Sequence, residues 1–275
     1  MKNKITFIVL FIVLSFSSLQ AQVNQEWVER YSGFANSLAI DNSGNVYVTG
    51  SSYASGTDED YATIKYSSSG EQLWVQRYNG TANSKDCASS ILVDGLGNVY
   101  VTGWSYVAGG PHFATIKYSS AGEQKWIQIY KEVTPSWNRG ILPSLAVDGL
   151  GNVYVTGSSV GIGNNLDYAT IKYDSSGVQQ WVQKYDMNTH DESKSIAVDD
   201  SGNVYVTGSS ATIKYNSAGV QQWIQNPGIY GRLLAVDSLG NVYITGTGLS
   251  GYITIKYNSS GVQQWIQMYG EQYGN

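Results

Sequence analysis

The chain has 275 residues, with 21 acidic and 16 basic side chains, 31 glycines, 22 tyrosines and 4 prolines. The net negative charge argues against binding to nucleic-acid phosphates, so no nucleic-acid partner is expected. Cys87 is the single cysteine, which excludes a disulfide within the chain. Abundant glycine and tyrosine with scarce proline favour many short β-strands joined by tight turns.

The first 21 residues have the pattern of a secretory signal peptide. Lys2 and Lys4 provide a positive start, an apolar run begins at Ile5, and small and polar residues follow up to Ala21. The run is too short for a spanning helix and no longer one follows, so no membrane span is expected. Removal of this segment leaves 14 basic and 21 acidic residues, a net charge of −7. We therefore expect an exported protein with a single domain over residues 22–275.

A seven-residue motif, Gly-Asn-Val-Tyr-Val-Thr-Gly, occurs four times, and a fifth copy differs only by Ile244. Three residues before each copy stands an aspartate: Asp41, Asp94, Asp148, Asp199 and Asp237. Downstream, Ala-Thr-Ile-Lys-Tyr or a close variant leads through a glycine turn to a tryptophan: Trp74, Trp126, Trp181, Trp223 and Trp265. Successive tryptophans are 52, 55, 42 and 42 positions apart, which indicates a repeat architecture.

Each repeat predicts four β-strands, here named A to D in chain order. In the first repeat they are residues 38–41, 45–49, 62–66 and 73–77, the second of them rich in β-branched and aromatic residues. The aspartate of the A–B turn can accept backbone N–H bonds, and its glycine can adopt positive φ. No window has a 3.6-residue apolar period, so helices are not expected.

Four antiparallel strands in each unit of 42 to 55 residues are typical of a β-propeller blade. Separate small domains are the weaker interpretation, because a lone sheet of this size could not bury both faces. The repeated tryptophans are expected to pack between adjacent blades rather than to stack on a cofactor, and no cofactor is predicted. The predicted fold class is therefore all-β, a β-propeller of four-stranded antiparallel blades.

These motifs resemble the SBBP-type repeat of secreted bacterial β-propeller proteins. The resemblance rests on Ile-Ala-Val-Asp-x-x-Gly-Asn-Val-Tyr-Val-Thr-Gly, on Asp60–Lys65, and on Gly70 and Trp74, and it extends from Trp27 to Tyr269. The family implies export and a role at the cell surface or outside the cell. Bacterial export by the signal peptide also leaves the periplasm as an alternative location. It implies no particular chemistry.

An extra D-type segment, Gln25–Tyr31, precedes the first repeat. Propellers often close by letting an N-terminal strand complete the last blade, but strands A to C of such a blade would have to follow Tyr269, and the sequence stops at Asn275. The leading expectation is five complete repeats plus one extra outer strand, truncated from a six- or seven-bladed ring. A closed five-bladed ring with one redundant D-type strand is the alternative.

The loops fall into two classes. The A–B and C–D turns are nearly constant, whereas the B–C and D–A loops on the opposite face vary, the B–C loops from two residues to the eleven of Ser51 to Tyr61. Length variation confined to one face is typical of a scaffold with a binding face. The candidate ligand-binding residues of this face are Tyr53, Asp60, Trp104, His112, Trp137, Asp167 and His190.

The sequence predicts an interaction module whose ligand, a glycan or a protein, binds this variable face. Aromatic rings would stack on a sugar and carboxylates would accept its hydroxyls, although ordinary solvated loops would carry the same residues. Asp60, His112 and Asp167 occupy equivalent positions just before strand C, which favours structural capping. A propeller enzyme, a lyase or hydrolase using loop histidines and carboxylates, and a purely structural surface protein are the alternatives. No catalytic residue is assigned, and residues 58–60 supply too few oxygen ligands for a metal site.

Overall fold

The computed structural model describes residues 25–108, 110–131, 142–160, 165–248 and 251–270. Within these ranges the chain has no helix, hence none that could span a membrane, and forms five four-stranded antiparallel sheets of consecutive strands. The strands are β1 (Phe34–Ile40), β2 (Val46–Tyr53), β3 (Glu59–Tyr66), β4 (Gln72–Tyr78), β5 (Asp86–Val93), β6 (Val99–Val107), β7 (Gly110–Tyr118), β8 (Gln124–Tyr130), β9 (Ser144–Val147), β10 (Val153–Val160), β11 (Leu166–Tyr173), β12 (Gln179–Tyr185), β13 (Ser193–Val198), β14 (Val204–Gly208), β15 (Thr212–Tyr215), β16 (Gln221–Gln225), β17 (Tyr230–Val236), β18 (Val242–Gly248), β19 (Gly251–Tyr257) and β20 (Gln263–Tyr269). The predicted all-β architecture of four-stranded blades, numbered 1 to 5 below, is confirmed.

Strands B and C of the first blade extend further than the sequence predicts. β2 and β3 stay paired as far as Tyr53 and Glu59, so that only residues 54–58 connect them. The predicted eleven-residue loop from Ser51 to Tyr61 is therefore wrong. The polar residues there suggested a loop, but they continue the backbone ladder and their side chains alternate between the two faces of the sheet.

The A–B turns are built around the five repeated aspartates. In blade 3, Asp148 Oδ1 accepts bonds from the backbone N–H groups of Leu150 and Asn152, both at 2.9 Å. Its Oδ2 accepts the Asn152 side-chain amide at 2.8 Å and the Tyr154 hydroxyl at 2.9 Å. Burial raises the pKa of Asp148, but these bonds outweigh it and hold the pKa below its ordinary value. The equivalent four bonds recur at Asp41, Asp94, Asp199 and Asp237.

The tryptophan of each strand D packs on the next blade. The Trp181 indole lies against Gly219 in the C–D turn of blade 4, where a Cβ would come within 2.9 Å of the ring, and its Nε1 donates to the Ser217 carbonyl at 3.2 Å. Lys172 of strand C donates to the same carbonyl at 3.0 Å. Gly219 has a φ of 83°, so its place in the turn also favours glycine. Three tryptophans make the same contact with a turn carbonyl and glycine: Trp74 with Ser120 and Gly122, Trp126 with Ser175 and Gly177, and Trp223 with Ser259 and Gly261.

The hydrophobic core consists of layers between consecutive blades. At the junction of blades 3 and 4, for example, buried Tyr154 packs with Val204, Val206 and Ile213 of the following blade. Blades 2, 3 and 4 therefore each bury one face against the preceding blade and the other against the following blade.

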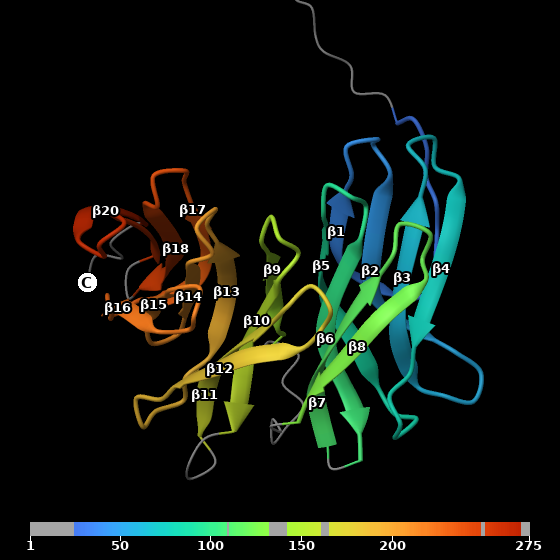
Figure 1. Ribbon diagram of the computed structural model, residues 1–275, viewed down its shortest axis with the longest axis horizontal. Coiled ribbons are helices and arrows are strands. Elements are labelled where there is room, and N and C mark those ends of the chain that lie inside the picture. Colours follow the sequence, from blue (N-terminus) through green and yellow to red (C-terminus); the bar gives the residue numbers. More distant parts are fainter. Residues whose placement is uncertain (1–24, 109, 132–141, 161–164, 249–250, 271–275) are drawn as a thin grey trace, which may run out of the picture.

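The five blades form an open arc, with blade 1 and blade 5 at opposite ends (Figure 1). Leu38 of β1 is 63 % exposed, whereas Ile91, at the equivalent position of blade 2, is 2 % exposed. On the last blade Tyr252 is 67 % exposed, against 1 % for the equivalent Tyr168. The two end faces thus do not cover each other, and the described residues do not form the closed five-bladed ring.

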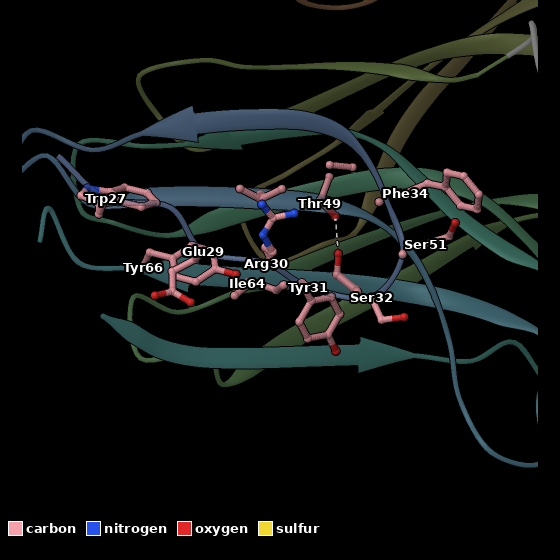
Figure 2. A pocket seen from close by; sticks show the side chains of 15 residues that line it. Trp27, Glu29, Arg30, Tyr31, Ser32, Phe34, Thr49, Ser51, Ile64 and Tyr66 are labelled. Atoms are coloured by element: carbon pink, nitrogen blue, oxygen red, sulfur yellow. Dashed lines mark hydrogen bonds between the residues drawn. The ribbon is translucent and has the colours of Figure 1, made fainter. Parts of the chain in front are cut away.

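Residues 25–31 occupy the place of strand D of a blade that would precede blade 1. Trp27 lies against Gly70, its Nε1 donates to the Ser68 carbonyl at 3.2 Å, and no ladder partner is described for this segment. A groove separates it from β1, β2 and β3 (Figure 2). The extra D-type segment therefore repeats the blade-junction contact without belonging to a complete blade.

Trp181→Ala should lower the free energy of unfolding by about 3 kcal/mol, because it removes an aromatic layer between two blades. Trp265→Ala is the matched control: Trp265 has the same place in β20, but no following blade is described, so a loss below about 1 kcal/mol is expected. Urea denaturation of dilute protein measures both. Equal losses would contradict the assignment of the tryptophan contact to the blade junction.

Candidate functional site

The variable face carries the B–C and D–A connections. Its described parts include residues 54–58 and 79–85 beside blade 1, residues 186–192 after blade 3, and residues 226–229 after blade 4. The A–B and C–D turns lie at the other ends of the same strands. Binding residues on the two faces are therefore separated by the length of a strand.

A small pocket opens on the variable face where blades 1 and 2 meet. It brings together an indole, a carboxylate, an amide and an amine that come from different blades. Its lining residues are Phe34, Asn36, Ser51, Glu59, Lys85, Cys87, Trp104 and Leu142. Of the residues predicted from the sequence, Trp104 belongs to this pocket.

The carboxylate of the pocket is held in place by its neighbours. Glu59 is buried, and it accepts the Tyr53 hydroxyl at 2.9 Å and the Ser51 hydroxyl at 3.3 Å. The exposed Tyr53 therefore supports the pocket from its rim. The Trp104 ring stands edge-on to Tyr106, with ring centroids 5.6 Å apart. A positioned indole beside a fixed carboxylate suits a ligand with both an apolar face and hydroxyl groups.

Three predicted residues lie inside the blades. Asp60, His112 and Asp167 are buried at equivalent positions in β3, β7 and β11, not in loops before strand C as the sequence predicts. Each pairs across the ladder with a buried serine: Ser52, Ser105 and Ser159. Burial, together with the nearby Lys131, lowers the pKa of His112. Their positions favour the structural interpretation over ligand contact.

Asp86 is a buried carboxylate that the sequence analysis does not single out. It is the first residue of β5 and accepts the backbone N–H of Gly80 at 2.6 Å and that of Tyr106 at 2.8 Å. Burial raises the pKa of Asp86 to about 6 against these bonds, with a further contribution from nearby Asp60. The sequence contains one indication of its importance: an aspartate, Asp191, stands at the equivalent position of blade 4.

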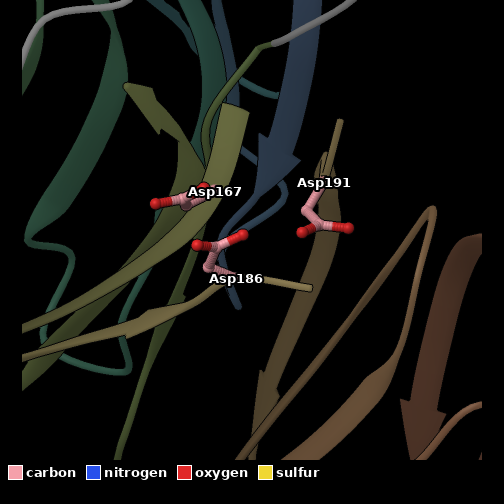
Figure 3. Close-up of side chains that lie close together, drawn as sticks. All are labelled: Asp167, Asp186 and Asp191. Atoms are coloured by element: carbon pink, nitrogen blue, oxygen red, sulfur yellow. The ribbon is translucent and has the colours of Figure 1, made fainter. Parts of the chain in front are cut away.

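Asp191 also belongs to a group of three carboxylates with Asp167 and Asp186, whose oxygen atoms lie within 4.8 Å of one another (Figure 3). Asp191 already accepts the backbone N–H of Met187 at 2.7 Å and the Thr189 hydroxyl at 2.8 Å. These bonds shape the D–A loop. Burial raises the pKa of Asp167, and the charge of Asp186 adds to this effect.

A second polar group lies on the variable face of blades 4 and 5. The exposed His190 has its Nε2 3.3 Å from Glu192 Oε1, and Lys194 Nζ lies 2.9 Å from Glu192 Oε2, which also accepts the Tyr230 hydroxyl. Burial raises the pKa of Glu192, but the bonds from Tyr230 and Lys194 outweigh it and lower the pKa overall. The Tyr230 ring also faces the Arg232 guanidinium at 5.3 Å. His190 is thus joined to a charged network and lies apart from Trp104. Trp137 lies outside the described residues.

The chain belongs to the β-propeller repeat family SBBP, whose model matches residues 29–56, 73–111, 143–166, 187–212 and 221–253. No curated protein matches the chain. Among solved structures it is similar to a protein of unknown function from Bacteroides caccae, with a TM-score of 0.57 and 13 % identity over 87 % of this chain and 83 % of the other. It is also similar to BamB from Moraxella catarrhalis, with a TM-score of 0.56 and 14 % identity over 88 % of this chain and 67 % of BamB. At these identities the likeness concerns the fold.

Asp86 makes the stability of the protein depend on pH in a defined direction. Because its pKa is raised from 3.8 to about 6 on folding, its stabilising contribution is present at low pH and is lost as the pH rises through about 6. Because asparagine does not titrate, Asp86→Asn should reduce the decline in the free energy of unfolding between pH 3.8 and about 6 by roughly 1–3 kcal/mol. Urea denaturation at a series of pH values measures the slope. A variant with the wild-type slope would rule out Asp86 as its source.

Proposed function

We propose that the protein is an exported interaction module that binds a glycan at the variable face, with the pocket around Trp104 as the contact site. The observation that carries this proposal is the convergence of Trp104 with Glu59, Asn36 and Lys85 in one pocket. Export is supported by the signal-peptide pattern of residues 1–21.

The chemistry of the pocket favours a sugar over a charged small molecule. The indole of Trp104 offers an apolar surface for the C–H face of a sugar ring, while Glu59 and the Oδ1 of Asn36 accept hydroxyl bonds. The Nδ2 of Asn36 already donates to the Ala88 carbonyl at 2.8 Å and to Cys87 Sγ at 3.1 Å, which fixes the orientation of this amide. Glu59 is oriented by Tyr53 and Ser51, so its position is set before a ligand arrives. Preorganisation of this kind lowers the entropic cost of binding.

The histidines are poorly placed for acid–base catalysis at this pocket. His112 is buried within β7, and His190 faces Glu192 near blade 4. General acid–base catalysis requires that the acid or base lie within hydrogen-bond distance of the reacting group. The positions of both histidines therefore favour a binding role for the pocket over a lyase or hydrolase role.

Trp104→Ala should weaken the binding of a glycan selected on a glycan array by about tenfold, because the stacking surface is lost. Leu150→Ala is the matched control, since Leu150 is exposed at an A–B turn on the opposite face, and its affinity should equal that of the wild type. Isothermal titration calorimetry gives both values. Wild-type protein that binds no glycan, or a Trp104→Ala variant with unchanged affinity, would overturn the proposal.

A further inference from the structure

The open arc ends in two faces that are the two halves of the blade junction. The entry face of blade 1 carries Leu38 and Ile40, and the exit face of blade 5 carries Tyr252, Trp265 and Tyr269. Tyr269 is 82 % exposed, whereas Tyr130, at the same position of blade 2, is 7 % exposed. Within the chain, every exit face that is followed by a blade lies on an entry face.

The polar contacts of the junction are also divided between the two ends. At the junctions that follow blades 1 and 3, the tyrosine before the Ala-Thr-Ile-Lys-Tyr motif donates to an alanine carbonyl of the next blade: Tyr61 to Ala114 and Tyr168 to Ala211, both at 3.2 Å. The motif lysine donates to the carbonyl of the next C–D turn, as Lys214 does to Ser259 at 3.1 Å. Blade 5 carries the corresponding donors, Tyr252 and Lys256. Blade 1 carries the corresponding acceptors, the carbonyls of residues 62 and 68.

One component of the junction is already present at the entry face. Trp27 occupies the place against Gly70, its ring centroid lies 6.0 Å from that of Tyr66, and Arg77 donates to the Tyr31 hydroxyl at 3.1 Å. Figure 2 shows Trp27, Tyr31 and Tyr66 beside the groove on blade 1. At the next junction, Lys65 and Trp74 both donate to the Ser120 carbonyl. A full contact at the entry face therefore needs both a tryptophan and a lysine. Residues 25–31 supply only the tryptophan.

We propose that the chain associates head to tail: the exit face of one copy docks on the entry face of a second copy, and Trp265 of the first takes the place of Trp27 in the second. A second copy fits because its exit face carries the tryptophan and the lysine of every internal junction, and the tyrosine of the junctions that follow blades 1 and 3. β20 is held by its ladder to β19, whereas no ladder is described for residues 25–31, so the N-terminal segment is the one displaced. In the single chain this segment partly covers the entry face and limits association.

The test compares two tryptophan variants that should act in opposite directions. Trp27→Ala frees the entry face and should lower the dissociation constant for self-association by about tenfold or more, whereas Trp265→Ala should raise it by a similar factor. Sedimentation velocity from micromolar to submillimolar concentration measures both, and thermal melts of dilute samples confirm that each variant is folded. Wild type and Trp27→Ala that both stay monomeric at every concentration would overturn the proposal.

A cross-linking experiment identifies the faces. In a Cys87→Ser background, one sample carries Ser68→Cys and another carries Lys256→Cys, and a short bifunctional maleimide is added to each alone and to the mixture. Head-to-tail docking predicts a cross-linked dimer only in the mixture. Cross-linking within either single sample would assign the interface to another surface and would refute head-to-tail docking. Association that Trp265→Ala leaves unchanged would also refute it, because the entry face would then belong to a different partner.

Discussion

The contact between a strand-D tryptophan and the glycine turn of the next blade determines how this molecule is built. The indole can approach the turn only because no Cβ is present, and the same glycine adopts the positive φ that closes the turn. Trp181 and Gly219 illustrate both requirements at one position. Because the contact always links one blade to the following one, the fold is stabilised by nearest-neighbour junctions in the manner of a repeat protein. Such a stack has two uncovered ends unless the ring closes, and here the ends lie apart.

Local structure was largely predictable because each repeat contains the same turn-forming residues. Asp148 and Gly151 stand at the spacing that an A–B turn requires, and the structure forms that turn. Strand length was harder to predict, since Ser52 and Asp60 are polar and suggested a loop although they pair within the ladder. The closure of the ring depends on the angle between blades, which is set by side chains packed across each junction. No local pattern in the sequence encodes that angle.

The candidate site was predictable only where one blade departs from the others. Trp104 follows the repeated motif at a position that holds serine in blades 1, 3 and 4, and it lies in the pocket. Glu59, Asn36 and Lys85 come from other parts of two blades and show no common spacing, so only the fold brings them together. By contrast, Asp60, His112 and Asp167 share one repeat position, and all three are buried. In a repeat protein, residues common to the repeats serve the blades, and residues peculiar to one blade are better candidates for function.

The proposed self-association has a consequence for the proposed binding. A junction between copies that repeats the junction between blades continues the same arrangement of strands, so the variable loops of successive copies lie on the same side of the assembly. Each copy then presents its Trp104 pocket on a common surface. A glycan with repeating units could engage several pockets at once, and the effective concentration of the second contact would raise the overall affinity without any new contact in the single site. If both proposals hold, a small pocket repeated along the assembly would be sufficient for firm attachment to a polymeric ligand.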